Sequence, residues 1–525
     1  MNNALINSDK MKLVSTTKTP KYLVAISLFS TVFVLIPVIY LLIRSSENGI
    51  LSFIDLMGRP KTLQTLFTSL ALSLVVAVGS LTLGLFVAST LAKTNVYLKR
   101  FFLILMPLPL AIPSYVIAYS YLAIFPFLQG FWISAFILSV ATFPFVAIPT
   151  YSILRKININ QEEVARTLGL TPLKVFLKII WPQIKNVSFA GALLSALYAL
   201  AEFGTVSFMR LDTFTRVIYT TYRAAFDRST AASLAIMLLA LSLIVVYTEK
   251  KSRGQIVLTN SGGKTGSLFD LKRYRFLSSF SLFGLNLLCL GIPGYVLISR
   301  TIDLGVDIDL IQLLSTTWNT ASVAFIGASL SIIFAVPIGI LISRFKSKLA
   351  TSLENIFLIT HAIPGVIIGL ALVAIGSRFL SGIYQTLYLL AIAYSILFIA
   401  NSLGTIRNNL EKIPVKFEEI SRTLGQNYFQ SLRRIVLPIA APGILSGWLL
   451  VFVSAMKELP ATLMLRPTGF ETLATSIWTQ TSISQFAQAA PFALALICVA
   501  SIPSYLINRP NVAETSIMRD NIKYD

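Results

Sequence analysis

Long apolar runs alternate along the chain with short polar and basic connections. A helix that crosses the hydrocarbon core of a bilayer needs roughly 20 mostly apolar residues, and it satisfies its own backbone hydrogen bonds there. The pattern therefore predicts an all-α, polytopic membrane protein with about 12 transmembrane helices. The predicted spans lie at 22–44, 64–92, 101–125, 131–152, 187–209, 231–248, 276–299, 315–344, 353–375, 384–404, 441–465 and 486–507.

Composition and charge placement support this interpretation. Hydrophobic residues make up 55% of the 525 residues and charged residues only 12%, whereas soluble domains carry about 25% charged residues. The net charge of +21 suggests nucleic acid, but Lys and Arg cluster in the N-terminal tail, in 249–275 and after the second and eighth runs. The positive-inside rule places such segments in the cytoplasm. We therefore expect a lipid bilayer and no nucleic acid as partner, with both termini cytoplasmic. The segment 210–230, with four Arg, is an exception.

The sequence contains few residues that could form a catalytic or metal-binding site. The first apolar run follows a basic tail but is long for a signal peptide, so we interpret it as a retained span. Cys289 and Cys498 fall within predicted spans, and His361 is the only histidine. We therefore predict no catalytic, cofactor-binding or metal site.

An internal repeat organises the chain. The segment EEVARTLG at 162–169 returns as EEISRTLG at 418–425, an offset of 256 residues that also relates Glu202 to Glu458. Six predicted spans separate equivalent points, so both copies face the same side of the membrane. The sequence therefore predicts two parallel six-helix repeats, a first over 1–255 and a second over 256–525, with 249–275 as linker.

Each repeat carries a short helix–turn–helix outside the spans, at 160–185 and 414–441. In the first copy, Asn160 and Glu163 suit a capping box, and Gly169 suits a left-handed helix end. Thr171 and Pro172 then begin a second helix, which we expect Pro182 to end. The second copy repeats this pattern with Glu419, Gly425, Asn427 and Pro438. A single copy would fit an amphipathic connector at the membrane surface, whereas two matching copies favour a shared docking surface.

These motifs resemble the EAA loop of ABC importer permeases. The residues that match are Glu163, Ala165, Gly169, Ile179 and Pro182 in the first copy, and Glu419, Gly425, Ile435, Leu437 and Pro438 in the second. Trp181 replaces the usual Leu, and Ile420 and Ser421 replace two Ala. Further segments resemble fused ferric-iron permeases: LAEFGTVSF at 200–208, THAIPGVIIGLALV at 360–373 and KELPATLMLRPTGFETLAT at 457–475.

The resemblance implies a type I ABC importer permease in the bacterial inner membrane. A periplasmic binding protein would deliver the substrate, ferric iron on this resemblance, and two ATPase subunits would dock on the two loops. The permease itself would be no enzyme. The segment GGKTGS at 262–267 lacks the first glycine and the preceding strand of a P-loop, so we expect ATP to be used by separate chains.

Few charged residues fall within the predicted spans, and such residues are functional candidates. Glu202 and Glu458 occupy equivalent positions, and Lys457 is adjacent to the second. The two acids either attract a cation in a translocation path or hydrogen-bond between helices. Permeases for another small solute, such as thiamine, a phosphonate or a different anion, share parts of the motifs above and are the alternative. A secondary transporter is a weaker alternative, because it usually needs coupling acids in the membrane, of which only two candidates exist, and it does not explain the repeated loops. An intramembrane enzyme is also weaker, because the sequence shows no nucleophile–base pair or metal cluster.

Overall fold

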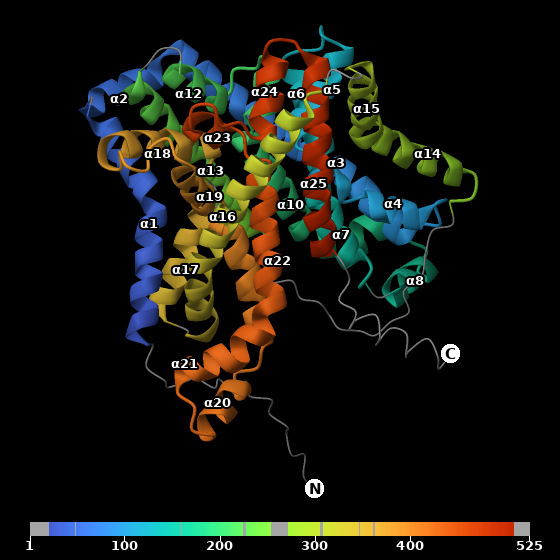
Figure 1. Ribbon diagram of the computed structural model, residues 1–525. Helices are drawn as coiled ribbons and strands as arrows, with labels where there is room; N and C mark the ends of the chain where they lie inside the picture. The colour runs from blue at the N-terminus through green and yellow to red at the C-terminus, as the bar shows by residue number, and fades with distance from the viewer. Residues whose placement is uncertain are drawn as a thin grey trace.

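The computed structural model describes residues 20–47, 49–157, 159–223, 227–253, 271–304, 308–345, 347–360 and 363–508. These residues form helices and their connections, and no β-strand occurs among them. Two groups of helices lie side by side, but the chain crosses between them: the first helix, in blue, lies against the yellow and orange helices, and the yellow-green helices lie against the blue and teal ones (Figure 1). The all-α prediction is therefore confirmed for the described residues.

The helices up to residue 253, called the first half below, begin with a long helix and end with another. They are α1 (Lys21–Ser46), α2 (Gly49–Gly58), α3 (Pro60–Lys93), α4 (Lys99–Leu105), η1 (Leu108–Leu110), α5 (Ser114–Ile124), α6 (Phe131–Thr142), α7 (Pro144–Leu154), α8 (Ile159–Thr167), α9 (Pro172–Val175), η2 (Phe176–Ile180), α10 (Trp181–Ala201), α11 (Gly204–Phe208), α12 (Phe214–Arg223) and α13 (Arg228–Arg253).

The helices from residue 271, called the second half below, follow a closely similar order. They are α14 (Tyr274–Asn286), η3 (Leu287–Gly291), α15 (Ile292–Leu304), α16 (Leu310–Arg344), α17 (Lys348–Thr360), α18 (Gly365–Phe379), α19 (Leu387–Lys412), α20 (Lys416–Thr423), α21 (Tyr428–Ser431), η5 (Leu432–Val436), α22 (Leu437–Met456), α23 (Pro460–Leu465), α24 (Leu473–Ser482) and α25 (Phe486–Asn508). Thus α16 corresponds to α3, α20 to α8 and α22 to α10.

Several predicted spans are not continuous helices. Among the described residues, ten helices are long and apolar enough to cross a bilayer, or up to 11 with one bent pair. That pair, Lys99–Leu110 with Ser114–Ile124, bends by 95° and replaces the predicted span 101–125. The predicted span 353–375 is likewise divided into α17 and α18. Pro113 and Pro364 immediately precede α5 and α18, and a proline supplies no backbone N–H to continue a preceding helix.

The predicted spans 187–209 and 441–465 are also divided. Helix α10 ends at Ala201 and α11 begins at Gly204, while α22 ends at Met456 and α23 begins at Pro460. The sequence alone suggested unbroken spans because the residues around both breaks are apolar. Glu202 and Glu458 therefore lie in the breaks between helices, rather than inside continuous helices.

The first helices of the two halves pack across the boundary between them. Helix α1 contacts α16 and α18 of the second half as well as α13, and α15 contacts α5 of the first half as well as α25. The largest buried apolar cluster contains residues of both halves. Against this cluster, Trp478 stacks on Phe208 at 5.1 Å between ring centroids and also contacts Phe203. The two halves therefore share one core.

Small residues allow helices of the first half to approach closely. At Gly191 in α10, a Cβ would lie 2.5 Å from the carbonyl oxygen of Phe145 in α7. Small residues are characteristic of contacts between membrane helices, because lipid provides no hydrophobic drive for association. Helix α10 therefore packs closely on both α7 and α3.

Candidate functional site: two coupling segments and two central carboxylates

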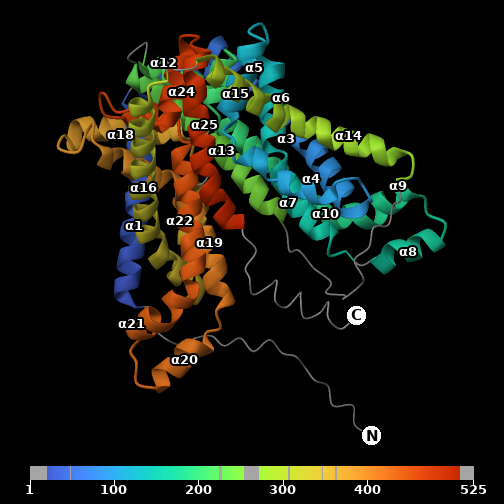
Figure 2. The same cartoon turned by 45° about the vertical axis from the view of Figure 1, so that its right-hand side comes forward.

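The two helix–turn–helix segments lie toward one end of the molecule. Figures 1 and 2 show α8 and α20 in the lower part of the views, away from α12 and α24 at the upper end. We call α8 with α9 the first coupling segment, and α20 with α21 the second. The repeated motifs of the sequence thus occupy the same end of the two halves.

Both segments turn through the same backbone geometry. Gly169 and Gly425 each have a φ of 83°, which confirms the predicted left-handed helix ends. The amide of Gly169 donates to Arg166 O at 2.9 Å, and that of Leu170 donates to Ala165 O at 3.1 Å. This pair of bonds is a Schellman motif, and Gly425 and Gln426 repeat it.

Two predicted helix boundaries in these segments are wrong. Helix α8 already includes Ile159, so Asn160 lies inside it rather than capping it. Pro182 does not end the second helix either, because the chain continues through the π-helical turn η2 into α10. The Trp181 amide donates to Phe176 O, and this wider turn accommodates the missing proline donor. Pro438 follows η5 in the same way. The predicted capping role of Asn427 is confirmed.

The coupling segments expose apolar side chains at equivalent positions. Leu168 and Leu424 are each 77% exposed, and Val164 and Ile420 are each 57% exposed. Leu173 and Phe429 are also exposed. The predicted motif residues Glu163 and Glu419 lie on these open surfaces, as do Pro182 and Pro438, whereas Ala165 and Ser421 are buried. Exposed apolar residues grouped in this way mark surfaces that another protein or a lipid membrane covers.

A buried ion pair lies beneath each surface. Glu162, which directly precedes the motif glutamate, pairs with Lys93 at the end of α3, with 2.5 Å between Nζ and Oε1. Glu418 pairs with Arg344 at the end of α16, with 2.7 Å between Nε and Oε1. All four side chains are at most 8% exposed. Sequence reasoning did not select these residues, although the Glu-Glu doublet in both copies is a usable signal.

Burial determines the electrostatics of these two acids. It raises the pKa of the Glu162 carboxyl above its ordinary value, and the Lys93 ammonium opposes that rise. Burial likewise raises the pKa of Glu418, opposed by Arg344. Loss of either cation would leave a carboxylate buried without a counter-charge, which is much less favourable than an intact pair.

Glu202 holds two short helices together at the break after α10. Its Oε1 accepts from the Thr205 amide at 2.9 Å, at the start of α11. Its Oε2 accepts from the Ser114 hydroxyl at 2.8 Å, at the first residue of α5. The backbone carbonyl of Glu202 accepts from Thr215 Oγ1 at 2.6 Å. A carboxylate at helix N-termini is favourable because the peptide dipoles point their positive ends at it.

Glu458 does the same in the second half. Its Oε1 accepts from the Ala461 amide at 2.9 Å, and its backbone carbonyl accepts from Thr462 Oγ1 at 2.8 Å. Gly365, the first residue of α18, approaches it so closely that a Cβ there would lie 2.2 Å from Oε1. Both predicted path residues therefore cap the short helix that follows each break.

Lys457 connects the two halves at this level. Its Nζ donates to Leu110 O at 3.0 Å, at the end of η1. In return, Tyr115 Oη donates to the Lys457 carbonyl at 3.4 Å. Lys457 therefore binds the broken helix of the first half and forms no ion pair with the adjacent Glu458 among the described residues.

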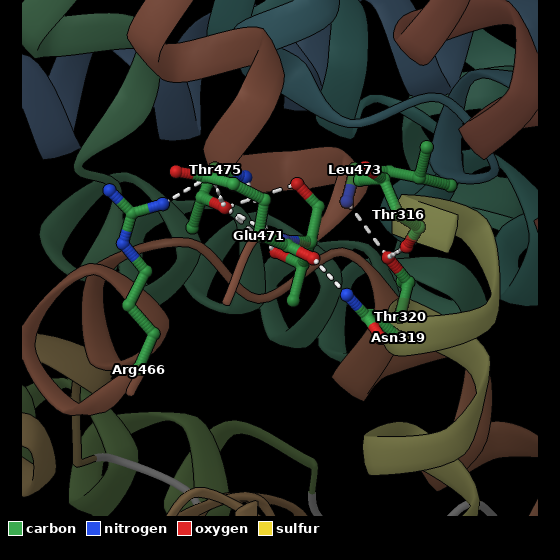
Figure 3. Close-up of polar contacts among 8 residues, drawn as sticks. Thr316, Asn319, Thr320, Arg466, Glu471, Leu473 and Thr475 are labelled. Carbon is green, nitrogen blue, oxygen red and sulfur yellow. Dashed lines mark hydrogen bonds and ion pairs between the residues drawn. The ribbon is translucent and has the colours of Figure 1, made fainter. Parts of the chain in front are cut away.

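The loop between α23 and α24 is fixed to α16 at the upper end of the molecule. Figure 3 shows Arg466 and Glu471 as an ion pair and Thr475 donating to Glu471. Asn319 of α16 donates to Glu471 O at 3.2 Å, and the Leu473 amide donates to Thr320 Oγ1 at 2.8 Å. In the first half, the Phe214 amide donates to Ser69 Oγ of α3 at 3.0 Å. The segment at 457–475 is thus anchored at both ends.

The chain matches the family described as binding-protein-dependent transport system inner membrane component, over residues 80–248 and again over 335–509. The chain belongs to this family. Each match contains one coupling segment and one of the two central carboxylates, so the permease carries both features twice.

Two relatives show how far the similarity extends. The Fe(3+)-transport system permease protein FbpB 2 of Haemophilus influenzae is 32% identical over 482 residues, which cover 90% of this chain and 95% of that protein. The sulfate transport system permease protein CysT of Salmonella typhimurium is 25% identical over 242 residues, 42% of this chain and 87% of that protein. The first is thus similar to both halves, and the second to less than half of this permease.

The inward-facing MetNI methionine ABC transporter aligns with 38% of the chain and 93% of its own, at 19% identity and a TM-score of 0.32. A score of this size does not establish a shared fold. The assignment to the permease family therefore stands on the sequence matches.

The capping geometry predicts different effects of two substitutions at each central carboxylate. Glu202→Ala and Glu458→Ala remove the acceptor of a helix-end amide and should each lower the free energy of unfolding by about 1–2 kcal/mol. Glu202→Gln and Glu458→Gln keep a carbonyl acceptor and should lower it by less than about 1 kcal/mol. Thermal unfolding of the detergent-purified permease measures the difference. Glu163→Ala, at an exposed position, is the control, and Ala variants at positions 202 and 458 as stable as that control would contradict the capping role.

Proposed function

We propose that the chain is the membrane-spanning permease subunit of an ATP-driven importer, and that it translocates ferric iron delivered by a periplasmic binding protein. The observation that carries this proposal is the pair of matching coupling segments at one end of the molecule. Their equal exposure of Leu168 and Leu424 fits two identical or similar partners. A permease of this kind needs no catalytic residue of its own.

The partners that fit the coupling segments are two ATPase subunits on separate chains. Each segment offers an apolar surface, with Val164 and Leu168 or Ile420 and Leu424. Arg166 and Arg422 stand beside these surfaces in the same turn. Protein interfaces combine an apolar centre with a polar rim and frequently include Arg. ATP would bind to the partner subunits, with no cofactor held by this permease.

Support for ferric iron comes from the extent of similarity. The Haemophilus influenzae relative, named for Fe(3+) transport, aligns across both halves. The sulfate permease aligns with less than half of the chain, so an oxyanion importer is the second candidate. The family membership speaks against a secondary transporter, because its description refers to binding-protein-dependent transport.

Glu202 and Glu458 remain the candidate residues of the translocation path. They lie in equivalent helix breaks, and Tyr115 of the first half reaches the Lys457 carbonyl beside Glu458. Two acids near the boundary of the halves would favour a cation. The capping contacts also support a structural role for these two acids. An experiment that removes the charge but retains the hydrogen bond distinguishes cation attraction from helix capping.

We place the coupling segments and both termini in the cytoplasm of a bacterium, with the permease in the inner membrane. The basic segments of the sequence support this orientation through the positive-inside rule. Residues 254–270 of the predicted linker 249–275 lie outside the described residues. The opposite end of the molecule, which carries α2, α12 and α24 (Figure 1), would then face the periplasm and the binding protein.

Cysteine labelling tests the orientation. In a Cys289→Ala, Cys498→Ala background, Leu168→Cys and Leu424→Cys should react with a membrane-impermeant maleimide only after the cytoplasmic face is opened. Ile50→Cys in α2, where the native side chain is 76% exposed, should react in intact spheroplasts. Labelling of positions 168 and 424 from outside would contradict both the orientation and the coupling role.

Substitution of the two turn glycines tests the ATPase interaction. Gly169→Val and Gly425→Val place a β-branched residue at a φ of 83°, where open space surrounds the Cβ. The strain is therefore in the backbone alone, about 1–2 kcal/mol. These variants should insert normally and copurify with less ATPase subunit than wild type.

Gly169→Asn and Gly425→Asn are the matched controls, because Asn tolerates the left-handed conformation; they should retain the ATPase subunit. Unchanged copurification in both Val variants would contradict the coupling role of these turns. So would wild-type transport in a double mutant with Glu163→Ala and Glu419→Ala, which removes both exposed motif carboxylates.

Charge removal at the central carboxylates tests the translocation path. If the charge attracts the cation, Glu202→Gln and Glu458→Gln should slow ferric iron uptake into vesicles that hold the complete complex and excess binding protein. ATPase association should not change. Uptake is divided by the amount of permease in the same vesicles. Wild-type uptake in both variants would leave only the capping role.

A further inference from the structure

The two buried ion pairs share features that the coupling motif alone does not explain. Each joins the first turns of a coupling helix to the last residue of a long membrane helix, Lys93 of α3 or Arg344 of α16. The partners are far apart in sequence, by 69 residues in the first half. The neighbouring motif glutamates, Glu163 and Glu419, are exposed. In both halves, therefore, the first glutamate of the doublet is buried and the second is exposed.

We propose that Glu162 with Lys93, and Glu418 with Arg344, are positioning residues that transmit the movement of each coupling helix to α3 and α16. The proposal rests on the proposed function, since it concerns how ATPase movement reaches the membrane. In this proposal the exposed Glu163 and Glu419 belong to the surface that contacts the ATPase subunits. The buried Glu162 and Glu418 connect the coupling helices to the membrane helices.

The burial of these pairs makes each one a tight connection. Opposite charges shielded from water attract each other more strongly than the same charges at the surface. Separation would leave two unpaired charges in apolar surroundings, which is strongly unfavourable. In the first half, Glu162 Oε1 contacts Lys93 Nζ at 2.5 Å, and Glu162 Oε2 is buried without a hydrogen-bond partner. The coupling helix and the end of α3 or α16 must therefore move together, because separate movement would break the ion pair.

The path from each ion pair leads to the broken helices. The chain after Lys93 continues directly into α4, η1 and α5, and the first residue of α5, Ser114, donates to Glu202. In the second half, Arg344 is followed by α17 and α18, and Gly365 of α18 lies against Glu458. A movement of the end of α3 thus acts on α5, which contacts Glu202. A movement of the end of α16 likewise acts on α18, which contacts Glu458.

The two connections differ in stiffness. Lys93 joins one acid through a single ammonium group. Arg344 forms an ion pair with Glu418 and donates through Nη1 to Leu410 O and Ile413 O, each at 3.1 Å, at the end of α19. A guanidinium offers several donors in a fixed plane, so Arg344 joins α16, α19 and α20 together. Loss of Glu418 should therefore disconnect α20 from both α16 and α19, whereas loss of Glu162 disconnects α8 from α3 alone.

The ratio of ferric iron transported to ATP hydrolysed, measured with the complete complex in vesicles, tests this role. Glu162→Gln and Glu418→Gln remove the charge and retain the size of the side chain. We expect normal copurification of the ATPase subunit, continued ATP hydrolysis, and a ratio about tenfold lower than wild type, with the larger loss at position 418. The exchange of Lys93→Glu with Glu162→Lys restores an ion pair and should recover most of the ratio. Asp55→Asn, at an exposed pair with Arg59, is the matched control and should match wild type.

The ratio is independent of how much complex assembles, which separates transmission from mere stability. A purely structural role predicts less complex with a wild-type ratio, and that result would overturn the proposal. Glu162→Asp and Glu418→Asp retain the charge on a shorter side chain and serve where a Gln variant does not accumulate. We expect an intermediate ratio in them, and a wild-type ratio would likewise count against transmission. Failure of wild-type permease to bind an ATPase subunit would instead contradict the proposed function itself.

Discussion

The hydrocarbon interior of the bilayer offers no water to a backbone amide or carbonyl, so each such group must find a partner in the protein. An unbroken helix satisfies this requirement by itself, but this permease interrupts its helices at equivalent places in both halves. The interruption after α10 exposes the first amides of α11, and Glu202 accepts from one of them. Thr215 then donates to the carbonyl of the same residue. The helix breaks near the boundary of the halves are stable because a carboxylate accepts from a backbone amide there and a threonine hydroxyl donates to a backbone carbonyl.

The missing backbone donor of a proline accounts for the π-helical turns that precede α10 and α22. A proline in the first turn of α10 or α22 removes one backbone donor and crowds the preceding carbonyl. The chain responds by widening the turn, so that Trp181 donates to Phe176 O and Leu437 donates to Leu432 O. The coupling segments are therefore continuous with the long helices α10 and α22, and a displacement of the segment reaches these helices without crossing a loop. The ion pairs to α3 and α16 add a second connection on the other side of the same segment.

Much of the architecture was predictable from local signals. The repeated Glu-Glu doublet, the turn glycines and the apolar runs each depend on a few neighbouring residues, and the structure confirms the left-handed turns and the helical class. Predictions failed where the outcome depends on distant partners. Nothing near Glu162 indicates that it is buried and Glu163 exposed, since the difference is determined by Lys93 at the end of α3. The breaks at Glu202 and Glu458 were missed for a similar reason: a glutamate among apolar residues looks like an isolated charge until the amides it caps are located.

The two halves share a plan but differ in the details that govern movement. In the first half, a serine hydroxyl at the start of α5 donates to Glu202, so carboxylate and helix are joined by a hydrogen bond. At the equivalent place in the second half stands Gly365, which offers no side-chain donor and permits only close contact with Glu458. At the coupling segments the difference is reversed, because Arg344 makes more contacts than Lys93. The first half is thus more firmly joined at its central break and the second at its coupling segment. A chain that contains both halves can retain such complementary differences, whereas two identical subunits could not.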